Sequence, residues 1–157
     1  MKPFLDKWTK QGIAIPGEGH FACPTFAVKK PGKDEPRWVH DLRARNKITE
    51  RDYTPIPEQR RMLESAAHAK FLSVLDLADA YHQIRIEPGY EQYNTISMLR
   101  GTYKVRVMLQ VDTNAPATMT RNITTLFDDL IGDCVWVYLD DIIIYSQSRQ
   151  EHLGHLR

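Results

Sequence analysis

The sequence predicts an α+β protein, and three observations lead to that class. Short β-rich runs such as "CPTFAVKK" and "VYLDDIIIY" are interspersed with stretches of helical spacing, so both kinds of element are expected. The two kinds do not follow the regular strand–helix–strand order of a parallel sheet. The chain has 157 residues, which is enough for one sizeable domain or for two small lobes that share a core. We therefore predict a single domain over residues 1–157.

The first third of the chain predicts a helix followed by a β-hairpin. Apolar residues at helical spacing precede a glycine in "PFLDKWTKQG", which indicates a short helix. "CPTFAVKK" and "PRWVHDL" have the composition of strands, and the intervening "PGKDE" is typical of a turn. Residues 29–61 are rich in Lys and Arg, with Trp38 and Tyr53 among them. A solvated charged face and a surface for phosphates and stacked bases both explain this composition.

The remaining elements follow from local signals. "TPIPEQRRMLESAAHAK" predicts a helix over about Pro57–His68, because prolines precede a run of helix formers. Asn114 and Pro116 are suited to the start of a long helix, as cap and first-turn residue. A final helix is expected in "SRQEHLGHLR". Strands are predicted for "FLSVLDL", Gln83–Ile86, "TYKVRVML", "CVWVYL" and "IIIYS".

Composition excludes several classes of protein. The chain is 42% hydrophobic and 26% charged, with a formal net charge of +1, so it lacks the global basic field of a histone-like protein. Cys23 and Cys134 are far apart and form no metal-binding or redox pair, which favours a reducing compartment. No apolar run is long enough for a signal core or a membrane span. We therefore expect an intracellular protein that is neither secreted nor in a membrane.

Acidic residues follow two of the predicted strands. Asp140 and Asp141 interrupt the apolar run "VYLDDIIIY", where burial and like-charge repulsion would both be costly. A hairpin with these residues at its tip would direct both carboxylates to one end of a sheet, and Asp76 ends another apolar strand. Three carboxylates at two strand ends suit Mg²⁺, which prefers oxygen ligands. The alternative is structural: Asp76 would cap a turn, and the aspartate pair would lie in a solvated loop.

Several motifs, in order along nearly the whole chain, resemble the reverse transcriptases of gypsy-type LTR retrotransposons. They are "TFAVKK", "RWVHDLRARNKIT", "FLSVLDLADAYHQIRI", "TNAPATM", "VYLDDIIIYS" and "EHLGHLR". The resemblance implies the fingers and palm of a right-hand polymerase, with an antiparallel palm sheet backed by helices. Residues 1–75 would be mainly fingers and residues 76–157 mainly palm, with interleaved boundaries. The implied activity is RNA-directed DNA synthesis, in which a deoxynucleotide is transferred to a primer 3′-hydroxyl.

The resemblance also implies a role for each matching residue. Mg²⁺ ions, with Mn²⁺ as an alternative, would be held by Asp76, Asp140, Asp141 and the carbonyl of Leu77. The incoming deoxynucleoside triphosphate would be bound by Lys30, Arg37, Asp79, Ala80, Tyr81 and Gln110, with Tyr81 rejecting a ribose 2′-hydroxyl. The RNA or DNA template with its primer would lie along Arg43, Asn46 and Tyr138.

Two departures from the family pattern lead to an alternative function. The chain reads "VMLQVDTNAPA" where gypsy-type enzymes typically read "VMPFGLTNAPA", so the branched Val111 replaces a glycine. The resemblance also ends before a thumb, which predicts low processivity and an exposed palm surface that a homodimer would cover. The alternative is a domesticated, non-catalytic module that binds nucleic acid or assembles. A metal-dependent phosphohydrolase is disfavoured, because no general base accompanies the three aspartates. A zinc site at His152 and His155 is disfavoured as well, because no further ligands are apparent near them.

Overall fold

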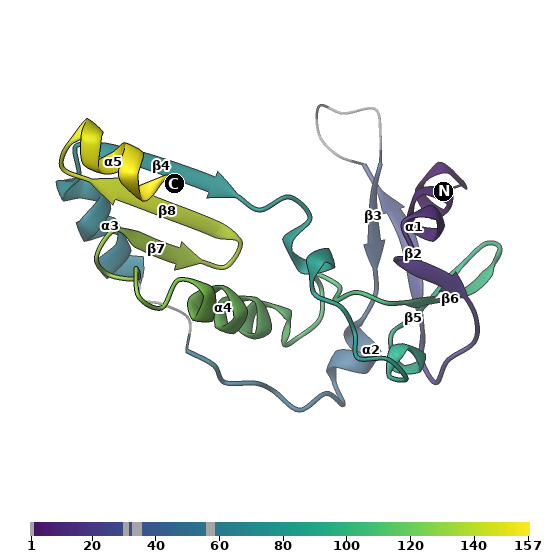
Figure 1. The fold of residues 1–157 in the computed structure, drawn as a ribbon. Helices are drawn as coiled ribbons and strands as arrows, with labels where there is room; N and C mark the ends of the chain where they lie inside the picture. Colours follow the sequence, from purple (N-terminus) through teal and green to yellow (C-terminus); the bar gives the residue numbers. More distant parts are fainter. Residues whose placement is uncertain (1, 30–31, 33–35, 56–58) are drawn as a thin grey trace. The chain divides into compact units, whose positions relative to one another are not determined.

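The computed structural model describes residues 2–29, 32, 36–55 and 59–157, and the chain divides into two compact units (Figure 1). Unit 1 comprises Met1–Arg51 and Tyr81–Ala115, and unit 2 comprises Asp52–Ala80 and Pro116–Arg157. Each unit is therefore assembled from two separate segments of the chain. In the described part of the chain, no helix has the length and apolar character that crossing a membrane requires.

Unit 1 is built on a five-stranded sheet in the order β1-β6-β5-β2-β3. Its neighbouring strands are antiparallel, except for the parallel pair β2–β5. The predicted hairpin is confirmed as β2 and β3, while most of its "PGKDE" turn lies outside the described residues. The strands are β1 Ala14–Pro16, β2 Ala22–Val28, β3 Arg37–His40, β5 Thr95–Met98 and β6 Gly101–Val105.

The helices α1 Lys2–Lys10 and α2 Arg43–Asn46 and the 3₁₀ helix η2 Glu91–Tyr93 accompany this sheet, together with all of the 3₁₀ helix η1 Ala80–Gln83 except its first residue. Helix α1 confirms the first predicted helix, and Gly12 follows it with a positive φ of 68°. Trp8 of α1 is buried with Ile96 and Val105 in the core of the unit. Leu109, which follows the sheet, is 1% exposed in the same core.

Unit 2 contains the three-stranded antiparallel sheet β4-β8-β7. Its strands are β4 Phe71–Asp76, β7 Val135–Tyr138 and β8 Asp141–Ser146. Its helices are α3 Gln59–His68, α4 Ala115–Leu126, whose first residue is assigned to unit 1, and α5 Arg149–His155. Val135 and Val137 of β7 are buried opposite Ile144 and Ile142 of β8, so one face of the sheet forms a core.

Three predicted elements differ from the structure. The strand predicted over Gln83–Ile86 is wrong: a 3₁₀ helix η1 covers Ala80–Gln83, and Arg85 makes only an isolated bridge to Val107 before the turn at Gly89 ends the pairing. Strand β6 is shorter than the predicted run "TYKVRVML" and ends at Val105, because beyond it Val107 makes only the isolated bridge to Arg85. The helix beginning near Asn114 ends at Leu126, since the acidic residues that follow oppose the helix dipole.

Burial of His40 predicts a pH dependence for the stability of unit 1. The residue is 9% exposed, and its Nδ1 is hydrogen-bonded to Thr25 Oγ1 at 2.8 Å. Desolvation, with smaller contributions from His82 and Arg45, lowers the pKa of His40 to about 4. Between pH values of about 6.5, the ordinary pKa of a histidine, and about 4, His40 is therefore protonated in the unfolded chain but neutral in the folded chain.

We expect the free energy of unfolding to fall by about 2 kcal/mol through His40 alone as the pH is lowered from about 7 to about 5. Urea unfolding followed by tryptophan fluorescence measures it. His40→Gln should reduce the pH dependence by that amount. An unchanged pH dependence in His40→Gln would contradict this account of the buried imidazole.

Candidate active site

The carboxylates predicted to bind metal are brought to one end of the unit 2 sheet. The antiparallel register of β4 and β8 places Asp76 directly opposite Asp141. Residues directly opposite each other project from the same face of a sheet, with Cβ atoms roughly 5 Å apart. Asp140 precedes Asp141 in the loop that joins β7 to β8. The structure therefore assembles Asp76, Asp140 and Asp141 within one unit.

The loop between β7 and β8 has only two residues, because Tyr138 of β7 pairs with Asp141 of β8. Its first residue, Leu139, has a φ of 57°, which short hairpin turns require but which a non-glycine residue disfavours by about 1–2 kcal/mol. The backbone N–H of Leu77 donates to the Asp140 carbonyl at 3.3 Å. Backbone strain of this kind is concentrated at functional sites.

The three carboxylates differ in their exposure to water. Asp76 and Asp141 are exposed and Asp140 is half-buried, so water offsets much of their mutual repulsion. Among the residues that the structure describes, no three His, Cys, Asp or Glu side chains form a cluster able to hold a metal ion. The donor chemistry suits Mg²⁺, whereas the side chains do not converge on a single point.

Four other predicted site residues, one of them in unit 1, lie close to these carboxylates in sequence. Tyr138 ends β7, and its hydroxyl accepts a hydrogen bond from Gln59 Nε2. Asp79 has a positive φ of 49°, and Ala80 is buried at the start of η1. Tyr81, the predicted sugar gate, is 8% exposed and belongs to unit 1.

In unit 1, Arg37 and Gln110 are in contact. Arg37 begins β3, and its Nη2 donates to Gln110 Oε1 at 2.9 Å, although 73 positions separate the two residues. Both side chains belong to exposed residues. Lys30, the other cation predicted to bind a triphosphate, lies outside the described residues. The structure thus brings together two of the predicted nucleotide-binding residues.

A cavity of about 390 Å³ lies beside Arg43 and Asn46. Its wall is completed by β2, β3 and the segment after Leu109, through Phe26, Val39, His40, Asp41, Leu42 and Val111. Arg43 donates from Nε and Nη2 to the two oxygens of Asp41, at 2.9 and 2.7 Å. These hydrogen bonds lower the pKa of Asp41 to about 2. The cavity therefore combines an exposed aromatic ring with a guanidinium and an amide.

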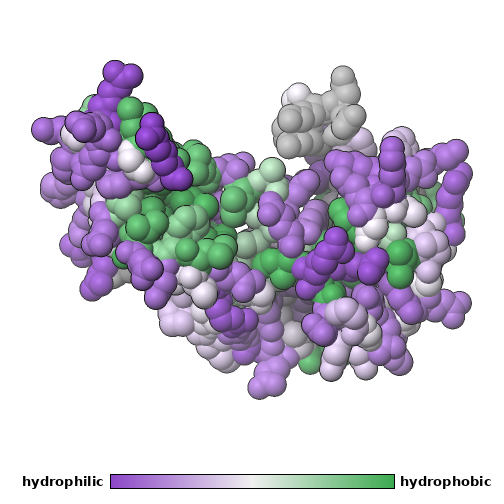
Figure 2. Space-filling view, in the orientation of Figure 1, coloured by the Kyte–Doolittle hydropathy of each residue, from purple (hydrophilic) through white to green (hydrophobic). Residues whose placement is uncertain are grey.

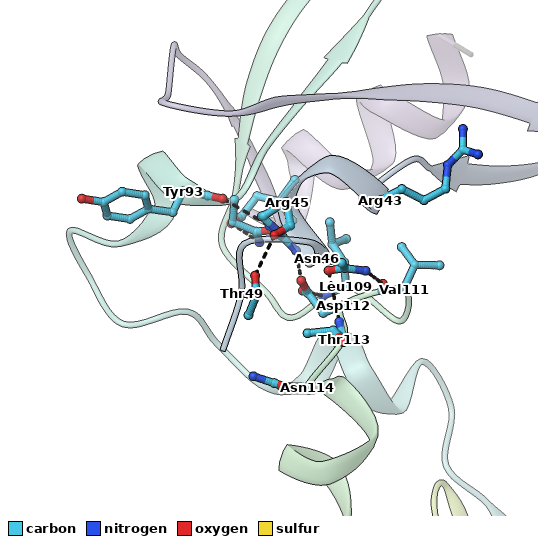
Figure 3. Close-up of polar contacts among 12 residues, drawn as sticks. Arg43, Arg45, Asn46, Thr49, Tyr93, Leu109, Val111, Asp112, Thr113 and Asn114 are labelled. Carbon is cyan, nitrogen blue, oxygen red and sulfur yellow. Dashed lines mark hydrogen bonds and ion pairs between the residues drawn. The ribbon is translucent and has the colours of Figure 1, made fainter. Parts of the chain in front are cut away.

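A buried ion pair that sequence reasoning missed holds the altered 109–112 segment (Figure 3). The side chains of Arg45 and Asp112 are 11% and 22% exposed, and they are ion-paired. Arg45 Nη1 also donates to Asn94 Oδ1 at 2.6 Å. Arg45 Nη2 makes no well-formed hydrogen bond, so the charge of Asp112 is its main compensation. Burial lowers the pKa of Arg45.

Asn46 makes a second connection to the same segment. Its Nδ2 donates to the Val111 carbonyl at 2.9 Å, and its Oδ1 accepts from the Thr113 N–H at 3.2 Å (Figure 3). The Asp112 carboxylate accepts from the Leu109 N–H at 3.3 Å. The sequence flagged this segment for its lost glycine, but it held no signal that Arg45 and Asp112 would meet.

Comparison with known proteins matches residues 28–157 to the model of the family described as reverse transcriptase (RNA-dependent DNA polymerase). The chain belongs to the reverse transcriptase family. The predicted resemblance to reverse transcriptases is thereby confirmed for residues 28–157.

Curated retrotransposon polyproteins of Drosophila melanogaster are similar to this reverse transcriptase-family chain along almost its whole length. The Retrovirus-related Pol polyprotein from transposon opus is 32% identical over 98% of the chain, and that from transposon gypsy is 31% identical over 94%. The chain spans 16% and 15% of these two relatives. It therefore corresponds to a small part of each polyprotein.

Solved structures confirm the α+β fold of this reverse transcriptase domain. The native protease-reverse transcriptase of prototype foamy virus matches 99% of the chain with a TM-score of 0.88 and 25% identity, over 21% of its own length. A foamy viral protease-reverse transcriptase in complex with an RNA/DNA hybrid matches 97% of the chain with a TM-score of 0.86 and 25% identity, over 20% of its length.

The buried pair Arg45–Asp112 predicts a large difference between single and double substitutions. Asp112→Leu leaves a buried guanidinium without its counter-charge, and we expect it to lower the free energy of unfolding by about 3 kcal/mol. Arg45→Met with Asp112→Leu should recover most of that loss, because neither charge remains. Urea unfolding of the single and double variants measures the coupling.

The exposed pair Arg60–Glu64 is the matched control, with side chains 82% and 56% exposed. Glu64→Leu should change the stability by less than about 0.5 kcal/mol through loss of that pair. Additive effects of Arg45→Met and Asp112→Leu would show that the two residues do not compensate each other.

Proposed function

We propose that this chain is a catalytic core of an RNA-directed DNA polymerase, with its active site at the carboxylate end of the β4–β8 pair. The observation that carries the proposal is the register that places Asp76 opposite Asp141, with Asp140 as the adjacent residue. Membership of the reverse transcriptase family supports it. Since the chain spans 16% or less of the polyproteins named above, the activity of those whole proteins is not assumed for it.

Asp76, Asp140, Asp141 and the carbonyl of Leu77 are the groups that would hold Mg²⁺, or Mn²⁺ in its place. Carboxylate and carbonyl oxygens are the ligands that these hard cations prefer. Bound divalent cations would lower the pKa of the primer 3′-hydroxyl and stabilise the charge of the leaving pyrophosphate. The two-residue loop restricts the backbone positions of Asp140 and Asp141. Because the side chains do not converge, metal binding would require them to reorient.

The residues proposed to bind the deoxynucleoside triphosphate are Lys30, Arg37, Asp79, Ala80, Tyr81 and Gln110. Lys30 and Arg37 would supply positive charge for the phosphates, and Arg37 would exchange its neutral partner Gln110 for a charged one. Asp79 and Ala80 would contribute backbone N–H groups, and Asp79 already has a left-handed backbone conformation. Tyr81 would exclude the ribose 2′-hydroxyl.

The cavity beside α2 is proposed as a site for an unpaired template base. Phe26 is 47% exposed and offers a ring for stacking, while Arg43 and Asn46 offer donors to a phosphate or base edge. The side chain of Arg43 is 86% exposed, so it can exchange Asp41 for a phosphate. Tyr138, at the end of β7, would contact the nucleic acid on the side of the carboxylates.

One observation favours the second candidate, a non-catalytic module that binds nucleic acid or assembles. The described residues hold no ready metal cluster, whereas the cavity beside Arg43 is already formed. Such a module would bind a template–primer duplex without extending it. Its assembly as a homodimer would cover apolar side chains of β4 such as Val74, which is 57% exposed.

Primer extension separates the two candidates. We expect the chain with Mg²⁺ to add deoxythymidine to an oligo(dT) primer on poly(rA), with low processivity. Asp140→Asn should lower the rate by about 100-fold or more, because it removes a charge that would face the metal. Asp128→Asn is the matched control, since Asp128 is an exposed carboxylate just beyond α4 in the same unit.

Extension by Asp140→Asn at the rate of the unsubstituted chain would contradict the proposed catalytic role. If the unsubstituted chain binds the duplex in a gel-shift assay but extends nothing, the non-catalytic module replaces the polymerase as the proposed function.

A further inference from the structure

Strand β4 has no hydrophobic alternation that could determine its register on β8. Its sequence "FLSVLD" is apolar on both faces, and Leu72, Val74 and Leu75 are 50%, 57% and 45% exposed. Figure 2 shows apolar side chains gathered on the visible face of unit 2, in the region where Figure 1 draws β4 and β8. Register is weakly specified where neither face is distinguished by polarity.

Chain connectivity does not determine this register either. A two-residue loop fixes β8 on β7, whereas β4 is an edge strand of the sheet and is separated in sequence from β8 by several other elements. Before Asp76, the only polar side chain of β4 is Ser73. A specific contact of Ser73 would therefore be the main side-chain determinant of how β4 aligns.

Ser73 has such a contact, through His152 of α5. Hydrogen bonds join His152 Nε2 to Ser73 Oγ and His152 Nδ1 to Ser146 Oγ, each at 2.8 Å. One imidazole thus connects β4 with β8. His152 and Ser146 are 8% and 3% exposed, so losing either bond would leave polar atoms shielded from water.

The position of His152 is itself well determined. Ser148 caps α5, accepting from the Glu151 N–H while the Glu151 carboxylate accepts from the Ser148 N–H. The ring of His152 also lies 6.2 Å from that of Phe71, the first residue of β4. The cap of the helix that carries the bridging imidazole therefore does not involve β4, and the imidazole contacts β4 through both Ser73 and Phe71.

We propose that His152 and Ser73 are positioning residues that set the register of β4 on β8 and so place Asp76 opposite Asp141. A slip of β4 by one residue turns the Asp76 side chain to the other face of the sheet. A slip by two residues keeps the face but moves Asp76 about 7 Å along β8. Either slip separates the two carboxylates. The value of this register for metal binding rests on the proposed polymerase function.

Disulfide trapping in the full chain tests the register directly. Val74 lies opposite Ile143, whereas Leu72 lies diagonal to it, at a distance that a disulfide does not span without a shift of two residues. Val74→Cys with Ile143→Cys should cross-link in glutathione buffer, and Leu72→Cys with Ile143→Cys should not. Adding His152→Leu or Ser73→Ala should shift the ratio of the two cross-links toward the slipped pair by about tenfold, the effect of losing one to two hydrogen bonds.

His155→Leu is the matched control, because His155 bonds Ser146 but makes no such bridge to β4. It should leave the cross-linking ratio unchanged. Ser73→Ala leaves every side chain of α5 unchanged and removes only a hydroxyl from β4. It therefore tests the register even if His152→Leu does not fold. An unchanged ratio in a folded Ser73→Ala chain, shown by circular dichroism, would overturn the proposal.

Mn²⁺ binding, measured by water proton relaxation, separates this proposal from the proposed function. Both positioning variants should bind Mn²⁺ about tenfold more weakly than the unsubstituted chain. An unsubstituted chain that binds no Mn²⁺ contradicts the polymerase proposal, while the cross-linking ratio still tests the register. Mn²⁺ affinity equal to that of the unsubstituted chain in the positioning variants contradicts the role of His152 and Ser73 in placing the carboxylates.

Discussion

Antiparallel pairing sets Asp76 of β4 beside Asp141 of β8, and the proposed metal site of unit 2 depends on these two carboxylates. The hairpin loop adds Asp140 as the neighbouring residue, and the Leu77 N–H bonds the Asp140 carbonyl. Two carboxylates on one face of a sheet repel each other. Exposure to water weakens this repulsion, and a divalent cation bound between the carboxylates would attract both of them. The same register thus carries an electrostatic cost and the capacity to bind metal.

Unit 1 contains a different electrostatic feature, the largely buried charged side chain of Arg45. Arg45 is largely buried, and it is tolerated because Asp112 supplies the opposite charge and Asn94 accepts a hydrogen bond. The ion pair of Arg45 with Asp112 also concerns the proposed nucleotide-binding residues, because Asp112 belongs to the same segment as Gln110, which accepts a hydrogen bond from Arg37. A segment that lacks the usual glycine is thereby held by side chains from α2 and β3.

Local patterns were sufficient to predict much of the fold and the identity of the metal-binding candidates. The β2–β3 hairpin, the aspartate hairpin and helix α1 each follow from residues close together in the chain. The pattern failed at Arg85, where a β-rich run forms only an isolated bridge because a 3₁₀ helix and a turn leave it too few partners.

The contacts that position the site could not be predicted, because each joins residues far apart in sequence. Arg45 meets Asp112, and Ser73 meets His152 79 positions away. The sequence also left the exposure of the "DD" pair open, and in the structure Asp141 is exposed and Asp140 is half-buried beside the tight loop at Leu139. One-dimensional periodicity carries no information on which side chain a distant element will supply.

Titration of Mg²⁺ into the isotope-labelled chain, followed by NMR, tests most directly the proposal that Asp76, Asp140 and Asp141 form one cation site. The account predicts saturable shifts of the carboxyl carbons of Asp76, Asp140 and Asp141 together with the amide of Leu77, with a common dissociation constant. Shifts that are absent at these residues, or that saturate independently at Asp76 and Asp141, would contradict it.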